Sequence, residues 1–227
     1  MKKILIILFL SIICISHIFS VNRSIRHSYT ADYSLFPETP YTNKYVKKLN
    51  SNYDIHYCVQ SIISIPKKDA KGYNCEQILQ KLDQMGGIDK ECFGVSYIDG
   101  KTGERKPIFK KARYDFEKNT LYIKDKAAGG LNFDVGIDTF QNSGNIYVVN
   151  AIVNKRPDNI FVGGIKKREA EIFVFMQEES EVINVYALIQ CSYNPLEHKF
   201  LKSYVESAVT ARVLELQNWF YRMLCKE

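Results

Sequence analysis

A chain of 227 residues that is 46% hydrophobic is long enough for one domain with its own core, with or without an appended arm. Its formal net charge of +6 falls to +4 if Lys2 and Lys3 are removed with an export signal, and the remaining basic residues are scattered along the chain. This mild excess argues against a nucleic-acid-binding protein, and leaves only weak contact with an anionic surface as an expectation.

The first 20 residues have the pattern of a secretory signal peptide. A positive start, "MKK", precedes the apolar run Ile4–Ile13, which is too short to span a bilayer comfortably. Cleavage is expected after Ser16 or Ser20, and a lipoprotein reading based on Cys14 is disfavoured because the bulky Ile13 precedes it. The sequence therefore predicts an exported protein of the periplasm or cell envelope.

Five cysteines remain after cleavage, and an odd number cannot all pair within one chain. In a domain of this size we expect buried thiols, with Cys75 and Cys92 as the first pair to test for a disulfide. There is no C-x-x-C motif, and His56-x-Cys58 is too weak a pattern to indicate zinc, so no metal site and no cofactor is predicted.

The mature chain divides into an arm and a single domain. Residues 21–50 are polar and turn-rich, with two prolines and no sustained period, which predicts an extended or disordered arm, or one laid across the domain. Residues 51–227 then form a single α+β domain. Its first strand is expected at 54–65, because β-branched and aromatic residues are frequent there and Pro66 ends the run.

A short helix with marked ends follows the first strand. Asn74 can cap it and Gln77 occupies the capping-box position, while Gly86-Gly87 closes it. After this helix the hydrophobic period changes to two, and strands are expected at 91–98, 106–116, 120–125, 131–140, 145–154, 159–165, 168–176 and 181–191. Short turns between successive strands favour an antiparallel meander.

Pro195 ends the last strand, and residues 197–227 read as one long amphipathic helix. This order of elements is that of a curved antiparallel meander that grips a long C-terminal helix, an α+β helix-grip arrangement. Such element order is similar to that of START-like proteins, which often keep an apolar cavity between sheet and terminal helix.

A second resemblance rests on the segments "ILQKLDQMGGID", "GVSYIDGKTGERKPIFKKARY", "LYIKDKAAGGLNFDVGIDTF", "GNIYVVNAIVN" and "ARVLELQNWFYRML". Together, over roughly residues 74–224, they resemble an uncharacterised family of exported bacterial proteins, known mainly from spirochaetes, whose domain has no assigned function. Arg212, Trp219 and Phe220 form its most distinctive pattern. The resemblance implies export and a shared fold, without a reaction.

One charged residue stands on the apolar side of the C-terminal helix. At 3.6 residues per turn, Arg212 falls inside the stripe formed by Val205, Val209, Leu216, Trp219, Phe220 and Met223. It could be a structural arginine whose partner is Asn150, Asn184, Tyr186 or Glu215. It could also extend to the rim with its stem beside Trp219, or hold the carboxylate or phosphate of an apolar ligand.

Two late strands are apolar on both faces, which leaves three interpretations open. Both the helix and the arm could cover the sheet, a hydrophobic ligand could occupy part of it, or a second protein could bind there. We expect a non-enzymatic protein that binds a hydrophobic or amphipathic, lipid-like small molecule between sheet and helix, because no catalytic spacing is present. The ligand-binding candidates are Arg212, Trp219, Tyr186, Asn184 and Phe175.

The alternative function is a cell-envelope interaction or structural module with a packed core and an envelope protein as partner. Asp134 and Asp138 share one face of a predicted strand, but spacing implies no third ligand or nearby histidine. The segment "GVSYI" lacks the last glycine of a serine elbow, and neither "AAGG" nor "VGGI" is followed by the Lys-Ser/Thr of a phosphate-binding loop. A hydrolase therefore finds no support in the sequence.

Overall fold

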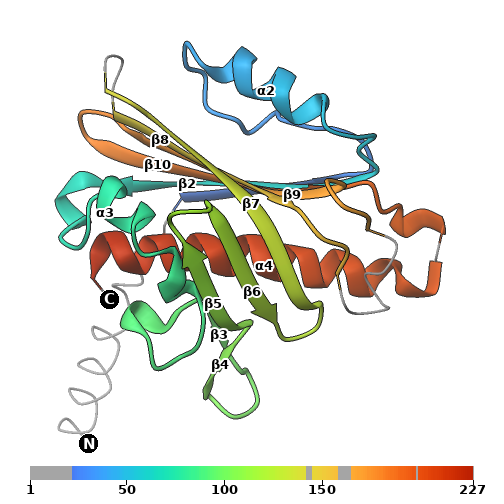
Figure 1. Ribbon diagram of the computed structural model, residues 1–227. Helices are drawn as coiled ribbons and strands as arrows, with labels where there is room; N and C mark the ends of the chain where they lie inside the picture. Colours follow the sequence, from blue (N-terminus) through green and yellow to red (C-terminus); the bar gives the residue numbers. More distant parts are fainter. Residues whose placement is uncertain (1–21, 142–144, 158–164, 198, 227) are drawn as a thin grey trace, which may run out of the picture.

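The computed structural model describes residues 22–141, 145–157, 165–197 and 199–226. The predicted signal peptide of residues 1–20, its cleavage sites and nearly all of the predicted strand 159–165 lie outside the described residues. The described chain is an α+β structure with one large sheet and a C-terminal helix (Figure 1).

Eight antiparallel strands form the sheet in the order β1-β2-β10-β9-β8-β7-β6-β5. The strands are β1 (Asn22–Ser28), β2 (Tyr57–Pro66), β5 (Phe109–Asp115), β6 (Thr120–Asp125), β7 (Gly129–Phe140), β8 (Asn145–Val153), β9 (Ala170–Glu178) and β10 (Val182–Cys191). The predicted meander is confirmed from β5 to β10, because each of these strands pairs with the next along the chain. The first predicted strand, β2, joins it beside β10.

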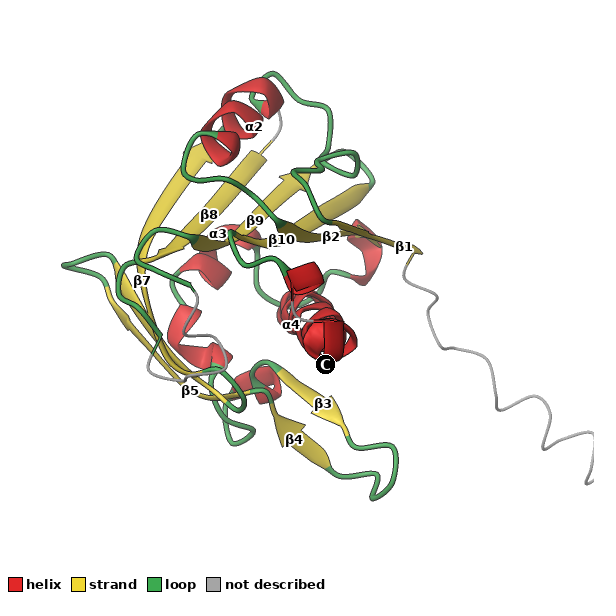
Figure 2. Ribbon diagram, turned by 90° about the vertical axis from the view of Figure 1, so that its right-hand side faces the viewer, coloured by secondary structure: helices red, strands yellow, loops and turns green. Residues whose placement is uncertain are grey.

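The long strand β7 connects two parts of the sheet. Its first half pairs with β6 from Gly129 to Asp134, and its second half pairs with β8 from Phe133 to Phe140. Figure 2 shows that the sheet turns at β7, so that β5 and β6 stand at an angle to the strands from β8 to β1. The resulting concave face holds the C-terminal helix α4 (Lys199–Cys225).

The main core lies between this concave face and α4. Alternate residues of each strand point to it, and they meet Val213, Leu216, Trp219 and Phe220 of the helix. Gln217, fully buried, donates from Nε2 to the backbone carbonyls of Ser61 and Val185, both at 2.9 Å. These bonds fix the rotation of α4 against β2 and β10.

The chain just before Asn74 caps the last turn of α4 with backbone hydrogen bonds. The Gly72 amide donates to the Leu224 carbonyl at 2.7 Å, which satisfies an oxygen that has no partner inside the helix. Only glycine fits this position, because a Cβ would lie 2.2 Å from a carbonyl oxygen of the same turn.

The predicted capping box is confirmed. In helix α3 (Cys75–Leu79) Asn74 accepts from the Gln77 amide and Gln77 accepts from the Asn74 amide. The helix is shorter than predicted and continues as a 3₁₀ turn, η2 (Leu82–Met85), which lies along β5. A further 3₁₀ turn, η3 (Glu91–Phe93), leads into a separate hairpin of β3 (Ser96–Ile98) and β4 (Arg105–Pro107).

Of the alternatives predicted for residues 21–50, the described residues 22–50 agree with an arm laid across the domain, and they are neither wholly extended nor disordered. They begin with β1, an edge strand on β2, and end in a helix, α2 (Thr42–Asn50), that lies on the face of the sheet opposite α4 (Figures 1 and 2). Tyr45 and Leu49, four residues apart, are fully buried there. The apolar residues of this short helix share one face, and the contact of that face with the sheet stabilises it.

An aromatic layer joins the arm to the outer face of the sheet. Its members are Phe36, Tyr45 and Leu49 of the arm and Cys58, Ile146, Val148, Phe173, Phe175, Tyr186 and Leu188 of the strands. The Phe36 ring lies 4.9 Å from those of both Phe175 and Tyr186. Of the three interpretations left open for the apolar faces, cover by both the helix and the arm is thus observed.

A buried carboxylate fastens the end of α2 to this outer face. Glu171, 1% exposed, accepts hydrogen bonds from Asn150 at 2.7 Å, Gln190 at 2.8 Å and Asn52 at 3.3 Å. Gln190 also donates to the Leu49 carbonyl at 3.2 Å. Within the described residues no cation pairs with Glu171, so amide donors alone compensate for its lost hydration.

The five cysteines of the described chain form no disulfide, which corrects the suggested Cys75–Cys92 pair and confirms the expected buried thiols for Cys58, Cys75 and Cys191. Burial raises the pKa of both Cys58 and Cys191 to about 12. These two thiols are therefore almost wholly protonated at neutral pH.

Substitution of Glu171 tests the fastening of the arm. Glu171→Leu should lower the free energy of unfolding by about 3 kcal/mol, because it removes the acceptor of the buried Asn150 amide and one acceptor each of Gln190 and the half-buried Asn52. Glu178→Leu, in the same strand, is the control and should cost less than about 1 kcal/mol, since Glu178 accepts a single exposed bond from Asn145. If urea unfolding gave the same loss of stability for the two variants, the assigned role of Glu171 would be contradicted.

Alkylation tests the buried thiols. Iodoacetamide at pH 8 should leave Cys58 and Cys191 unmodified in the native protein and modify both in denaturant, as measured by peptide mass spectrometry. Because their folded pKa is raised, their protonated form contributes its full stability below about pH 8.5, the value of an unfolded thiol, and this contribution is lost as pH rises towards 12. Modification of either thiol in the native protein would show that this cysteine is accessible to solvent and contradict the assignment.

Candidate functional site

An apolar pocket of about 170 Å³ lies between the concave face of the sheet and the first half of α4. Residues of the six strands from β5 to β10 form its walls, including Phe109, Leu131, Phe133, Ile172 and Ile189. The helix side is formed by Tyr204, Val205, Ala208, Val209 and Arg212. The pocket thus occupies the place where a packed core would be expected.

Two features of the sequence leave this space unfilled. Four of the wall positions are alanines, Ala127, Ala128, Ala170 and Ala208, whose side chains end at Cβ. In addition, no side chain of α4 is fully buried between Lys202 and Arg212, whereas burial begins at Val213 and continues to the C-terminus. The second half of the helix is therefore held by the core, and the first half covers the pocket.

Arg212 stands where these two halves of α4 meet. Its Nε donates to Oδ2 of Asp125 at 2.7 Å and its Nη2 donates to Oδ1 at 2.5 Å, a bidentate ion pair. Its Nη1 donates to the Ala208 carbonyl, one turn earlier, at 2.5 Å. The arginine side chain is 17% exposed and that of Asp125 is 0% exposed.

Asp125 holds the turn between β6 and β7 as well as the helix. Its Oδ1 accepts from the amides of Ala127 and Ala128, both at 2.7 Å, which is a local turn motif. The same carboxylate therefore fixes two of the alanine walls and the arginine. The pair is electrically neutral as a unit, so the pocket has a polar end without a net charge.

Arg212 is a structural arginine with a partner that the sequence analysis did not name. None of Asn150, Asn184, Tyr186 and Glu215 receives its hydrogen bonds. The signal for Asp125 was present in "DKAAGG", where an aspartate before small residues can accept from the following amides. Sequence alone gave no means to bring this turn to a helix 87 residues away.

The other candidate residues are not gathered around this pocket. Trp219 is fully buried beside Phe220, with ring centroids 5.0 Å apart, and its Nε1 has no hydrogen-bond partner within the described residues. Phe175 and Tyr186 lie on the opposite face of the sheet, in the aromatic layer under the arm. Asn184, half-buried, bonds to Ser64 and Glu179 near the end of β10.

Tyr186 serves as a structural hydroxyl in that outer layer. It donates to Oε1 of Gln60 at 3.2 Å, and burial raises its pKa well above the ordinary value. The phenol therefore stays protonated and keeps its role as a donor. Glu171 borders the pocket wall too, but its carboxylate is bound by amides of the outer face.

The pocket lining is suited to binding an apolar molecule, because most of its residues are apolar. Apart from the Arg212–Asp125 pair, its described walls offer few polar groups, and a search of the described residues finds no group of three or more metal-binding side chains. Comparison of the chain with protein-family models, with curated proteins and with solved structures finds no match.

A double-mutant cycle tests the ion pair. Arg212→Met should lower the free energy of unfolding by about 3–5 kcal/mol, because it leaves the buried Asp125 carboxylate without a cation. Adding Asp125→Asn, which removes that charge and keeps an acceptor for the turn, should recover part of the loss. The pair Lys118–Asp115, 3.3 Å apart with side chains 75% and 41% exposed, is the control and should give nearly additive effects in the same cycle. Additive effects at Arg212 and Asp125 would refute the coupling.

Proposed function

We propose that this chain is an exported, non-enzymatic protein that binds a small apolar molecule in the pocket between the sheet and the first half of α4. The observation that carries the proposal is the pocket itself, an apolar space of about 170 Å³ below residues 202–212 of the helix, none of which is fully buried. Ligand sites are typically concave, apolar and supplied with a few polar groups.

The volume limits the size of the ligand. An engineered apolar cavity of about 150 Å³ in another protein stays dry and binds benzene. A pocket of about 170 Å³ therefore suits a single small ring or a short hydrocarbon segment. A larger lipid would place only one end inside it.

The electrostatics favour an uncharged ligand. Asp125 already occupies two donors of the Arg212 guanidinium, so a ligand carboxylate would compete with a bidentate partner and leave Asp125 unpaired. The predicted role of Arg212 as a clamp for an anionic group is thus replaced by a neutral polar wall. Trp219, Tyr186, Asn184 and Phe175 would support the fold around the pocket without touching the ligand.

The helix-grip arrangement is part of this proposal. The sheet turns at β7 around α4 (Figure 2), and the pocket lies between the strands and this helix, an arrangement that resembles that of START-like proteins. Export is proposed from the signal-like residues 1–20, and the periplasm or cell envelope is the expected location.

Binding of toluene and benzoate, followed by NMR of the labelled protein, tests the function. Toluene should bind saturably and shift the amides around Ala128 and Val209, whereas benzoate, the same ring with a charge, should bind at least tenfold more weakly because its carboxylate must be desolvated. Val209→Phe should fill the pocket and abolish the shifts. Ser207→Phe, an exposed position on the same helix, should not.

Each result has a defined meaning. If neither compound binds, the pocket is not a ligand site and the proposal fails. Tighter binding of benzoate than of toluene would show that Arg212 exchanges Asp125 for a ligand anion, which contradicts the uncharged ligand. Equal loss in both phenylalanine variants would indicate damage to the helix.

A further inference from the structure

A second feature of the molecule, independent of the pocket, is a surface of unpaired cations on β5 and β6. Lys111 and Lys124 are direct cross-strand partners and both are exposed. Arg113 lies two residues from Lys111, so it is on the same face, and Lys126 follows Lys124 at the same spacing. These four residues are called the basic surface.

The arrangement costs stability. Like charges directly opposite on neighbouring strands repel each other, and within the described residues none of Lys111, Arg113 and Lys124 forms an ion pair. From Arg105 to Arg113 the chain has five basic residues and no acidic one. The acidic side chain at the end of β6, Asp125, is buried against Arg212 and cannot offset them.

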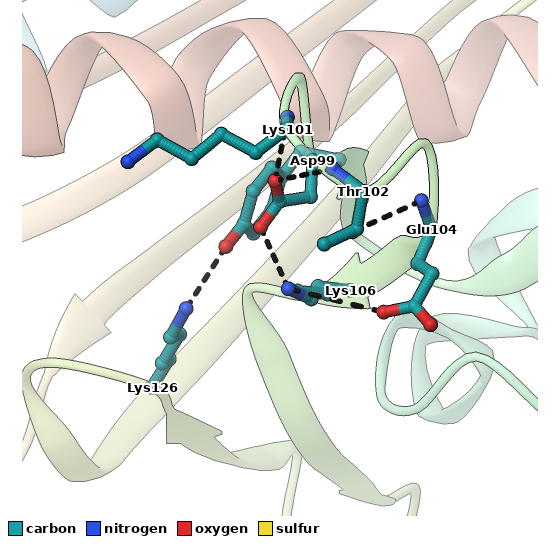
Figure 3. A network of polar contacts seen from close by, with 7 residues as sticks. Asp99, Lys101, Thr102, Glu104, Lys106 and Lys126 are labelled. Carbon is teal, nitrogen blue, oxygen red and sulfur yellow. Dashed lines mark hydrogen bonds and ion pairs between the residues drawn. The ribbon is translucent and has the colours of Figure 1, made fainter.

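The β3–β4 hairpin adjoins the basic surface. The Lys126 ammonium donates to the Tyr97 hydroxyl at 2.9 Å, which joins the end of β6 to the hairpin. Figure 3 shows this contact and shows that Asp99 of the hairpin turn is engaged by Lys106, at 2.7 Å. Figures 1 and 2 show the hairpin projecting from the body of the protein, at the end opposite α2.

Two apolar side chains are exposed on this projecting part. Ile98, the last residue of β3, is 53% exposed, and Phe93, just before the hairpin, is 45% exposed. Arg105 pairs with Ile98 across the hairpin, and its guanidinium lies 4.9 Å from the centroid of the Phe93 ring. Exposed apolar residues beside cations are typical of surfaces that enter the interfacial region of a bilayer.

The exposure of Phe93 is enforced by the backbone. Cys92 and Phe93 have φ of 54° and 59°, in the left-handed region that bulky residues rarely adopt. Arg222 of α4 holds this turn by donating to the carbonyls of Cys92 at 2.9 Å and Gly94 at 2.7 Å. Strained residues that the surrounding structure holds in place occur frequently at functional sites.

We propose that the basic surface and the adjoining hairpin dock on an anionic lipid bilayer, with Ile98 and Phe93 entering the interface between lipid headgroups and acyl chains. The positive charges of the basic surface are attracted to the anionic lipid headgroups. The two apolar residues favour a bilayer over a polyanion such as a nucleic acid. The contact is peripheral, since no helix within the described residues is long and apolar enough to cross a membrane.

Vesicle sedimentation tests the proposal. The full mature chain should bind vesicles of 30% phosphatidylglycerol in phosphatidylcholine at low salt, and should bind pure phosphatidylcholine far more weakly. Each cation removed should weaken binding about fivefold, so Lys111→Gln/Lys124→Gln should reduce it about 25-fold without lowering the melting temperature. The matched control Lys47→Gln/Lys48→Gln, two exposed lysines of α2, makes the same change in net charge and should bind normally.

A second variant separates a bilayer from other anionic partners. Phe93→Ser/Ile98→Ser keeps all charges and should lower vesicle binding about tenfold while leaving retention on heparin unchanged. Failure of the mature chain to bind anionic vesicles overturns the proposal, as does an equal loss in the Lys47/Lys48 control. Vesicle binding that the serine variant leaves unchanged, or binding to an oligonucleotide but not to vesicles, overturns the lipid assignment in favour of a polyanion.

Discussion

The ion pair between Arg212 and Asp125 is the constraint on which the pocket depends. It joins the middle of α4 to the turn after β6, which is separated in the sheet from β2 and β10, the strands that Gln217 in the second half of the helix contacts. Because both charges are desolvated and each has a bidentate partner, separating them would leave one buried charge without compensation. The pair therefore fixes the gap between sheet and helix, and the four alanines of the wall leave that gap open.

Much of the fold could be predicted because its determinants are local. The Asn74–Gln77 capping box, Pro66 at the end of β2 and the short turns that join β5 to β6, β6 to β7 and β9 to β10 each depend on a few neighbouring residues. The helix α2 could not be predicted in this way. It has no side-chain cap, and the residues that stabilise it, such as Phe173, belong to a strand more than a hundred positions later.

The candidate site was predicted only in part, for a similar reason. Periodicity placed Arg212 inside the apolar stripe of α4, and the structure puts it at the pocket. The same reasoning could not assign Tyr186 and Phe175 to a face, because both faces of β9 and β10 are apolar and a strand pattern alone does not say which face meets the helix. Nor could it find Asp125, whose contact with Arg212 requires the sheet to turn at β7.

The central claim is that an apolar pocket lies under the first half of α4 and is bounded at one end by the Arg212–Asp125 pair. Xenon binds apolar cavities without needing any polar partner, so diffraction from a crystal pressurised with xenon locates such a space directly. The account predicts a strong xenon peak among Leu131, Phe133, Ile172 and Val209, and a much weaker one in the Val209→Phe variant. A crystal of the unaltered protein with no xenon between the sheet and α4 would contradict it.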